Sequence, residues 1–297
     1  MNYLIIINPN SGKKKSLKIF KKKVSPILEN LNHKFEYHIT KYSGHAMGII
    51  KNHSLNDIDA IFVLGGDGTM HEVVNGMLNR EDKIIIPIGN IPTGSGNSLL
   101  YDLGKTDVDT TLNNILKHKI KNLDVLEVST EKNKIYSINL IGWGMGNDIG
   151  VLAEKMRWLG LMRYNIASII EIFRYRGRKA KIILDNNEQL NDNYALITIC
   201  NTVYVGKGMK MAPHAKLDDG KMDVIMIKDD FSKIELLKLF PKLFTGEHIK
   251  NQKVIYKQTK SFKLEPIKNE ILNIDGEIVG KTPIIVTTIP KAIKLLN

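Results

Sequence analysis

The chain has 297 residues, of which 43% are hydrophobic, enough to build one large core or two smaller ones. Its formal net charge of +12 favours anionic partners such as ATP, nucleic acid or an acidic membrane surface. The single cysteine, Cys200, excludes an internal disulfide. Residues 4–7 are too few for a signal peptide, and no apolar run approaches the ~20 residues of a membrane span, so we expect a soluble cytoplasmic protein.

Predicted strands and helices alternate over the first part of the chain. Residues 4–7 read as an apolar strand, 8–12 as a turn and 16–31 as a lysine-rich amphipathic helix. Residues 35–39 alternate as a strand, and a helix follows to about residue 51. A strand, turn and helix in this order are the usual opening of a doubly wound nucleotide-binding unit.

The central feature is a buried strand at 61–64 that ends in Gly65-Gly66-Asp67-Gly68 and continues as a helix. Such a turn leaves backbone N–H groups at a helix N-terminus, where the helix dipole favours anions. Glycine is needed because a side chain would keep phosphate away from the backbone. Asp67 repels phosphate unless it holds a metal or accepts a proton, so it indicates chemistry as well as binding.

A second glycine-rich loop at 89–98 follows a predicted strand at 84–88 and leads into a helix. Two such loops at the carboxyl ends of strands are what a doubly wound sheet uses to hold one nucleotide. A helix at 108–117 and a strand at 119–128, which carries Asp124, follow.

Beyond residue 125 the pattern changes to closely spaced strands, which predict an antiparallel sandwich. We therefore expect an α/β nucleotide-binding domain at 1–124 and a mainly antiparallel β-sandwich domain with inserted helices at 125–297. Residues 290–296 are expected to return to the first domain. The predicted strands are 134–140, 179–184, 194–199, 223–227, 253–256, 262–264, 271–274 and 284–288.

The stretch 65–76 resembles the nucleotide-binding signature of the diacylglycerol kinase catalytic domain superfamily, which includes sphingosine and ceramide kinases. NAD kinases and phosphofructokinases share the Gly-Gly-Asp-Gly turn, but the continuation through 71–76 is similar to the lipid kinase branch. At 94–98 the chain reads Gly-Ser-Gly-Asn-Ser, whereas the diacylglycerol kinase branch usually has Gly-Thr-Gly-Asn-Asp. This loop therefore resembles the sphingosine and ceramide kinase branch more closely.

The resemblance implies an ATP-dependent kinase that transfers the γ-phosphoryl group to a lipid primary hydroxyl, with ATP and Mg²⁺ as cofactors. Asp67 is the expected catalytic base, and Glu277 in the late motif 275–277 is its rival. The same resemblance implies a set of residues that bind ATP. They are Asn8, Pro9, Ser11, Gly12, Thr40, His45, Gly65, Gly66, Gly68, Thr69, Glu72, Gly94, Ser95, Gly96, Asn97, Arg157, Arg163, Asp275 and Gly276.

The segment 142–164 resembles a sphingosine and ceramide kinase motif whose two arginines, here Arg157 and Arg163, reach the ATP phosphates. Its acidic part meets the lipid head group, and Asp148 matches the first carboxylate there. Sphingosine kinases usually carry a second carboxylate two residues later, where this chain has Gly150. Ceramide kinases are more similar at this point, so we expect neutral lipids to be used at least as well as sphingosine.

Asp219 matches a carboxylate that holds a structural Mg²⁺ in bacterial members of the superfamily, although a plain Asp-Gly turn explains it equally well. The lysines of 13–23 form either a solvated helix face or a surface that attracts ATP or anionic lipid. We expect a lipid substrate at an anionic membrane surface, peripheral membrane association and no specific nucleic acid.

Two alternatives remain open at this point. An NAD kinase-like enzyme predicts Asn-Glu after the second glycine loop, where this chain has Asn97-Ser98. A non-catalytic basic protein would bind membrane or nucleic acid through its lysines. It predicts no joint retention of the four acidic residues Asp67, Glu72, Asp275 and Glu277.

Overall fold

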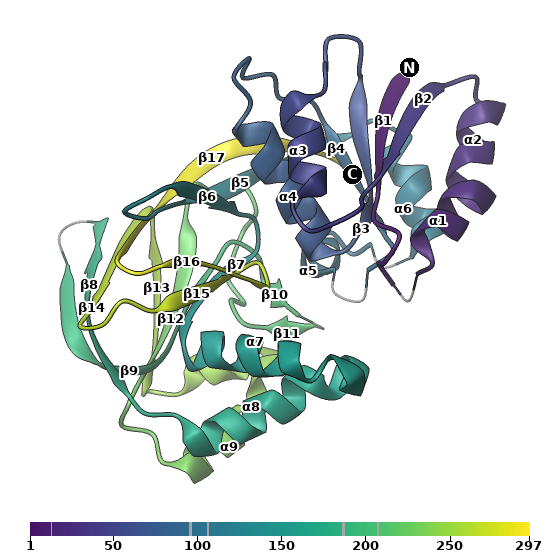
Figure 1. Cartoon of the computed structure of the whole chain (residues 1–297). Coiled ribbons are helices and arrows are strands. Elements are labelled where there is room, and N and C mark those ends of the chain that lie inside the picture. Colours follow the sequence, from purple (N-terminus) through teal and green to yellow (C-terminus); the bar gives the residue numbers. More distant parts are fainter. Residues whose placement is uncertain (13, 95–96, 106, 186–187, 207) are drawn as a thin grey trace. The chain divides into compact units, whose positions relative to one another are not determined.

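The structure is a computed structural model that describes residues 1–297 except 13, 95–96, 106, 186–187 and 207 (Figure 1). It divides into two compact units. The first unit comprises Met1–Leu123 and Lys291–Asn297, and the second comprises Asp124–Pro290. The C-terminal segment therefore belongs to the first unit. Among the described residues, no helix is long and apolar enough to cross a membrane.

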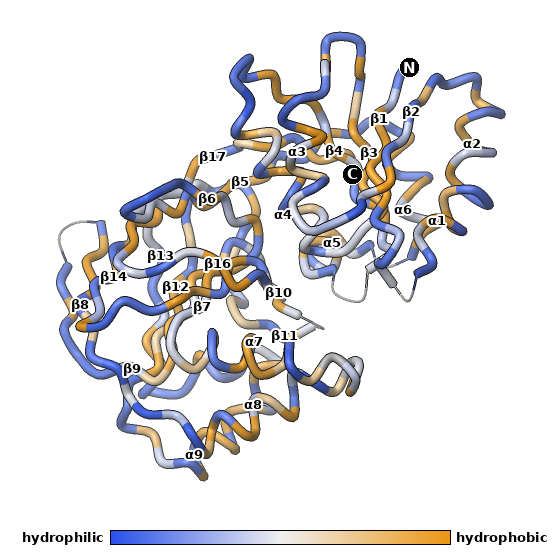
Figure 2. Tube along the Cα trace, viewed as in Figure 1, coloured by the Kyte–Doolittle hydropathy of each residue, from blue (hydrophilic) through white to orange (hydrophobic). Residues whose placement is uncertain are grey.

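The first unit contains a parallel sheet in the order β2-β1-β3-β4, extended beyond β4 by the end of β17 (Ile284–Leu296), where Leu295 is paired with Ile88. The apolar runs of β1 and β3 appear as orange stretches in Figure 2. A central β1 flanked by later strands is typical of doubly wound sheets. The first four strands are β1 (Asn2–Ile7), β2 (Lys34–Ile39), β3 (Ala60–Gly65) and β4 (Ile88–Pro92).

Helices cover both faces of this sheet (Figure 1). On one face, Phe20, Val24 and Leu28 share a buried core cluster with Tyr3 and Phe62. The predicted helix at 16–31 thus exists and buries the expected stripe, but a π-helical turn, η1, interrupts it. The helices of the unit are α1 (Ser16–Ile19), η1 (Phe20–Val24), α2 (Ser25–Asn30), α3 (His45–Asn52), α4 (Asp67–Leu78), α5 (Ser98–Asp102) and α6 (Val108–Ile115).

The strand predicted at 84–88 is wrong in its position, because β4 begins only at Ile88. Parallel pairing with β3 aligns Ile61 with Ile88, and the residues after Ile88, which include Gly89, form the strand that pairs with β3. Tertiary pairing here outweighs weak β-propensity. Gly89 suits this place, since a Cβ there would lie 2.8 Å from Ile115 of α6. The second glycine loop is consequently shorter than predicted and starts at Thr93.

The second unit is built on an antiparallel sheet, as the sequence predicts. Its long strand β9 pairs with β7, β8 and β12. The main strands are β6 (Lys134–Ser137), β7 (Leu140–Gly144), β8 (Arg178–Leu184), β9 (Gln189–Cys200), β12 (Met222–Lys228), β13 (Val254–Thr259), β14 (Ser261–Pro266), β15 (Ile271–Ile274) and β16 (Glu277–Lys281). Strand β5 (Ile120–Ser129) pairs with β6, and a small hairpin joins β10 (Tyr204–Val205) to β11 (Met209–Lys210).

Three features of this unit differ from the prediction. The single strand expected at 134–140 is two strands, because the backbone turns between Ser137 and Leu140 to bind Asp275. Strand β17 continues to Leu296 instead of ending at 288. Strand β16, which the sequence analysis did not separate from the turn before it, completes a hairpin with β15.

Helices of the second unit form two groups. The first group is α7 (Met145–Lys155), the 3-10 segment η2 (Arg157–Met162) and α8 (Arg163–Arg174). Helix α7 begins directly after Gly144, whose φ of 72° suits glycine, so the part of the 142–164 motif that carries Asp148 is helical. The second group was not predicted and comprises α9 (Lys233–Leu239), α10 (Lys242–Thr245) and η4 (Glu247–Lys250).

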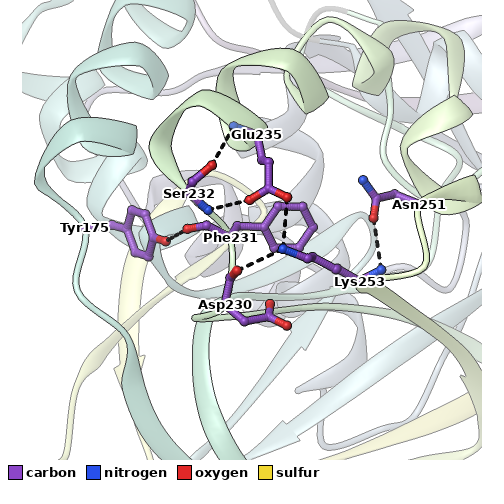
Figure 3. A network of polar contacts seen from close by, with 7 residues as sticks. All are labelled: Tyr175, Asp230, Phe231, Ser232, Glu235, Asn251 and Lys253. Atoms are coloured by element: carbon purple, nitrogen blue, oxygen red, sulfur yellow. Dashed lines mark hydrogen bonds and ion pairs between the residues drawn. The ribbon is translucent and has the colours of Figure 1, made fainter.

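A polar network fixes the start of α9 (Figure 3). The Ser232 hydroxyl accepts the Glu235 backbone N–H at 3.2 Å, and the Glu235 carboxylate accepts the Ser232 backbone N–H at 2.7 Å, forming a capping box. Lys253 binds the same carboxylate at 2.9 Å. The backbone hydrogen bond from Ser232 and the Lys253 contact lower the pKa of Glu235 to about 2. Nearby, the Tyr175 hydroxyl donates to the Phe231 carbonyl at 2.8 Å.

Candidate active site

The glycine-rich turn of the first unit joins β3 directly to α4. Helix α4 begins at Asp67, and its N-cap, Gly66, makes no side-chain capping hydrogen bond. Gly66 has no side chain that could cap the helix, and the backbone N–H of Thr69 donates to the Gly66 carbonyl at 3.1 Å. The N-terminus of a helix suits an anionic oxygen. Gly65 cannot be larger without a rearrangement, because a Cβ there would lie 2.4 Å from the Thr69 side chain. Gly65 is thus required by the packing of the turn against Thr69.

Asp67 is held by Ser98, the residue that starts α5. Its Oδ1 accepts the Ser98 backbone N–H at 2.9 Å, and its Oδ2 accepts the Ser98 hydroxyl at 3.1 Å. Both carboxylate oxygens are therefore oriented by one residue of the second glycine loop. The sequence analysis noted Ser98 only as the place of a missing carboxylate. The sequence did show that Ser98 starts the helix after that loop, and this position could have indicated its role in orienting Asp67.

The loop at 8–12 packs tightly against the two glycine-rich loops. Asn8 donates from Nδ2 to the Thr69 hydroxyl at 3.0 Å. Gly12 has a φ of 55°, and a Cβ on it would stand 1.7 Å from the carbonyl oxygen of Thr93. Only glycine permits this approach. The structure therefore brings the first predicted motif into contact with the other two.

The described part of the second glycine loop is also anchored to the first. The backbone N–H groups of Thr93 and Gly94 both donate to the Gly65 carbonyl, at 3.3 and 3.1 Å. The Asn97 side chain donates to the Gly94 carbonyl at 3.2 Å. The predicted ATP contacts Ser95 and Gly96 lie outside the described residues.

Three further residues expected at the nucleotide already have structural contacts. Both carboxylate oxygens of Glu72 accept backbone N–H groups, from Gly44 at 2.8 Å and Ala46 at 2.9 Å, and thereby fix the start of α3. The His45 ring accepts the Lys41 N–H at 3.1 Å through Nδ1. Thr40 is buried, and its N–H extends the β1–β2 pairing. Contact of these three with ATP stays a prediction.

The late motif of the second unit is a tight turn between β15 and β16. Asp275 is only 6% exposed and accepts hydrogen bonds from the Ser137 hydroxyl at 2.7 Å and from the backbone N–H groups of residues 138–140 at 2.8–3.0 Å. Its carboxylate thus binds the β6–β7 connection, and we read Asp275 as a residue that positions the turn. Gly276 takes a φ of 93°, which glycine alone adopts readily.

Glu277 follows this turn and is exposed at the start of β16. Within the described parts of the chain, no hydrogen bond or ion pair involves its carboxylate. Glu277 is therefore available to a ligand in a way that Asp275 is not.

Asp148, the predicted lipid-binding residue, lies in the first turn of α7 and is paired with an arginine that the sequence analysis did not identify. Arg178 binds its carboxylate at 2.7 Å and also lies 3.1 Å from the carboxylate of Glu270. Burial raises the pKa of Glu270, and the pKa of the nearby Glu171 is raised by burial and by the charge of Asp148. Arg178 therefore neutralises part of an acidic cluster.

The two predicted phosphate arginines flank η2. Arg163 lies 3.4 Å from the Glu154 carboxylate and its guanidinium carbon is 4.8 Å from the centroid of the Tyr164 ring. Its charge is therefore partly engaged within the second unit. The backbone of Arg157 is described, but its side chain lies outside the described part of the structure.

Two family models match consecutive parts of the chain. The diacylglycerol kinase catalytic domain matches residues 2–128, and the YegS C-terminal NAD kinase beta sandwich-like domain matches residues 139–297. The chain belongs to the diacylglycerol kinase catalytic domain family. It is a lipid kinase, and the alternative of a non-catalytic basic protein is not supported.

Individual relatives of this lipid kinase fall in two branches. It is 31% identical to sphingosine kinase 1 of Arabidopsis thaliana, with 94% of this chain and 68% of the relative covered. It is 28% identical to a diacylglycerol kinase of Bacillus subtilis, with 94% and 90% covered. The sphingosine kinase relatives support the predicted nearness to that branch.

Solved structures support the fold. A diacylglycerol kinase from Bacillus anthracis has a TM-score of 0.80 at 24% identity, with 99% of this chain and 96% of that one covered. An NAD kinase from Archaeoglobus fulgidus, in complex with ATP, has a TM-score of 0.56 at 12% identity, with 100% and 94% covered. The predicted fold class, an α/β unit followed by an antiparallel β unit, is confirmed. The NAD kinase structure is less similar to this chain than the diacylglycerol kinase structure, both in TM-score and in sequence identity.

The loop around Asp219 has the geometry of a simple turn in this lipid kinase. The Asp219 carboxylate accepts the Lys221 N–H at 3.1 Å, while the fully buried Asp124 accepts the Gly220 N–H at 2.6 Å. In the described part of the chain, no group of three or more histidines, cysteines or carboxylates could hold a metal. A metal role for Asp219 stays a prediction.

Proposed function

We propose that this lipid kinase transfers the γ-phosphoryl group of ATP to a primary hydroxyl of a sphingoid base, ceramide or diacylglycerol. The observation that carries the proposal is Asp67, a carboxylate at the N-terminus of α4 that Ser98 orients within a glycine turn. Phosphoryl transfer needs positioning, charge stabilisation and a group that accepts the hydroxyl proton. Asp67 is our choice for that group, and Glu277 is the rival.

The first unit binds ATP in this proposal. The N-terminus of α4, which follows a glycine that has no side chain, suits a phosphate oxygen. Mg²⁺ usually binds one or two carboxylates together with the phosphates of the substrate. Asp67 fits such a role, and the metal, when bound, neutralises charge on the phosphates. Arg157 and Arg163 are proposed to add positive charge at the same phosphates.

The second unit binds the lipid, with Asp148 near its head group. Because Arg178 pairs with Asp148, the carboxylate is already compensated and offers less to an ammonium group. This favours neutral lipids over free sphingosine. The two named branches of relatives, sphingosine kinase and diacylglycerol kinase, define the substrates to compare.

We further propose that the enzyme reaches its substrate by peripheral contact with an anionic membrane, through the segment η2–α8. Trp158, Met162 and Phe173 are 80%, 64% and 60% exposed, although large apolar side chains are normally buried. Met162 and Phe173, together with Ile169 at 43% exposure, recur at helical spacing and share one face. Arg174 adds positive charge at the end of α8. Exposed tryptophan and arginine beside an apolar helix face are typical of membrane interfaces.

The test of the main proposal is ATP consumption by the purified protein with diacylglycerol, ceramide, sphingosine and NAD offered separately in detergent micelles. The expected result is turnover with at least one lipid and none with NAD. Turnover with NAD alone would overturn the proposal. Mass spectrometry of the lipid product identifies the phosphorylated hydroxyl.

A further inference from the structure

The space beside Gly150 is filled by a side chain from a distant strand. Gly150 is buried in α7, and a Cβ placed on it would stand 2.3 Å from Nδ2 of Asn273 on β15. The next nearest group, Cδ1 of Ile278, would be 3.6 Å away. A contact under 3 Å is shorter than packed atoms allow, so the two positions compete for one volume. Asn273 occupies the place that a side chain at residue 150 would take.

Hydrogen bonding fixes which end of the Asn273 amide faces Gly150. The backbone N–H of Gly276 donates to Oδ1 of Asn273 at 2.9 Å. An N–H group needs an acceptor, so the oxygen must face Gly276 and the NH₂ group must face Gly150. Asn273 is 7% exposed, so its side chain has little freedom to reverse. The group that faces Gly150 is therefore the NH₂ group of Asn273, a neutral hydrogen-bond donor.

The surrounding charges agree with a neutral site. Asp148, two residues before Gly150, forms the ion pair with Arg178 described above, at 2.7 Å. Arg178 also approaches Glu270 at 3.1 Å. An ammonium group that approached Asp148 would meet a compensated carboxylate, and one that approached Asn273 would meet an amide donor. A hydroxyl or carbonyl oxygen could instead accept from that amide.

We propose that Asn273 is a specificity-determining residue, whose amide excludes a side chain at residue 150 and selects a neutral, oxygen-bearing lipid head over a protonated amine. The proposal rests on the proposed function, in which the Asp148 segment meets the lipid head group. The residue that determines lipid specificity then lies on β15, next to the 275–277 turn. Because the Asn273 side chain fills the space beside residue 150, only glycine fits at residue 150.

The principal test is Asn273→Asp. Aspartate keeps an oxygen to accept the Gly276 N–H, so the turn is retained, but it replaces the NH₂ group with a charged oxygen. The ratio of kcat/KM for sphingosine to that for diacylglycerol is expected to rise at least tenfold. The matched control is Asn191→Asp, an exposed position of β9 that carries the same charge change. A ratio that moves less than threefold, or equally in the control, overturns the proposal.

A second test uses the competition for space. Gly150→Asp alone is expected to lower the melting temperature and the turnover of every lipid. Adding Asn273→Ala in the same chain vacates the volume but also removes the acceptor of the Gly276 N–H. The double variant is therefore expected to melt at a higher temperature than Gly150→Asp alone and to favour sphingosine. If Gly150→Asp alone folds normally and changes preference as much as the double variant, Asn273 does not control this position.

The inference and the proposed function can fail separately. If the wild type turns over lipids but Asn273→Asp leaves the ratio of kcat/KM values unchanged, only the inference is overturned. If the wild type turns over no lipid, the proposed function is overturned. Binding of short-chain sphingosine and short-chain diacylglycerol, followed by tryptophan fluorescence, needs no turnover. The ratio of the two dissociation constants must still shift at least tenfold in Asn273→Asp for the inference to stand.

Discussion

At the scale of single residues, residues distant in sequence hold the two carboxylates that we propose for catalysis and lipid binding. Ser98 orients Asp67 in the first unit, while Arg178 compensates Asp148 in the second. The partners were not evident from local motifs, because a hydrogen bond between loops depends on how the strands pair. Two predictions follow from the first unit.

Replacing Asp67 with Asn preserves shape while removing both charge and basicity. We expect kcat for lipid phosphorylation to fall by ~10²-fold or more, since proton transfer to a positioned base contributes about that much. ATP affinity, measured by calorimetry, should change less than kcat. Asp57→Asn, an exposed carboxylate of the same unit, is the matched control. Near-normal turnover in Asp67→Asn would assign the base to Glu277.

Gly12→Ala tests the close approach of two loops. The new Cβ would stand 1.7 Å from the Thr93 carbonyl oxygen, so the two loops must separate. ATP affinity should fall at least tenfold. Gly104→Ala is the control, because Gly104 has a φ of 66° but no atom within 4 Å of its added Cβ. It should show only the cost of the left-handed backbone, about 1 kcal/mol, with unchanged ATP affinity. Equal ATP affinities in the two variants would contradict this account of the loop.

At the scale of elements, α9 illustrates how caps and contacts fix a short helix of seven residues. Such a helix is too short to be stable by itself, so its first turn and its packing must hold it. The first turn is stabilised by the Ser232 cap, the Glu235 carboxylate and Lys253.

Ser232→Ala removes the side-chain acceptor of this cap. We expect a loss of about 1 kcal/mol in the free energy of unfolding, the usual cost of removing a serine N-cap. Urea denaturation monitored by circular dichroism measures it. Ser25→Ala, which removes an exposed hydroxyl bonded to Glu29 within α2, is the control and should cost less. Equal losses would mean that the capping box contributes nothing special.

The capping box also predicts a pH dependence. The pKa of Glu235 is lowered to about 2 in the folded chain from an ordinary 4.5, so the unfolded chain binds a proton more readily. Its stabilising contribution is therefore complete above pH 4.5 and is lost as the pH falls toward 2. Glu235→Gln should flatten the acid limb of the stability curve over that interval. An unchanged slope between pH 4.5 and 2 would contradict the assignment.

At the scale of the whole molecule, the proposed membrane contact combines the net charge with the exposed apolar face of η2–α8. We expect the charge of +12 to attract an anionic bilayer and the apolar side chains then to partition at its surface.

Sedimentation with vesicles that contain phosphatidylserine tests this behaviour. Ile169→Ser/Phe173→Ser is expected to weaken vesicle binding at least tenfold, because burying one such side chain contributes roughly 1.5–3 kcal/mol. Ile267→Ser is the control, since Ile267 is 74% exposed on the same unit but outside this helix. Added salt should weaken the binding of all three proteins. Equal losses in variant and control would assign membrane contact elsewhere.

The sequence by itself determined the two kinds of unit, the two glycine-rich loops and the position of Asp67 at the start of a helix. These features depend on local patterns, namely apolar runs that end in glycine and strands at short spacing, which neighbouring residues encode. The tertiary structure alone decided the shift of β4 to Ile88–Pro92, the hold of Ser98 on Asp67 and the filling of the Gly150 space by Asn273. Each depends on pairing or packing between segments far apart in the chain, and local propensity carries no information about such contacts.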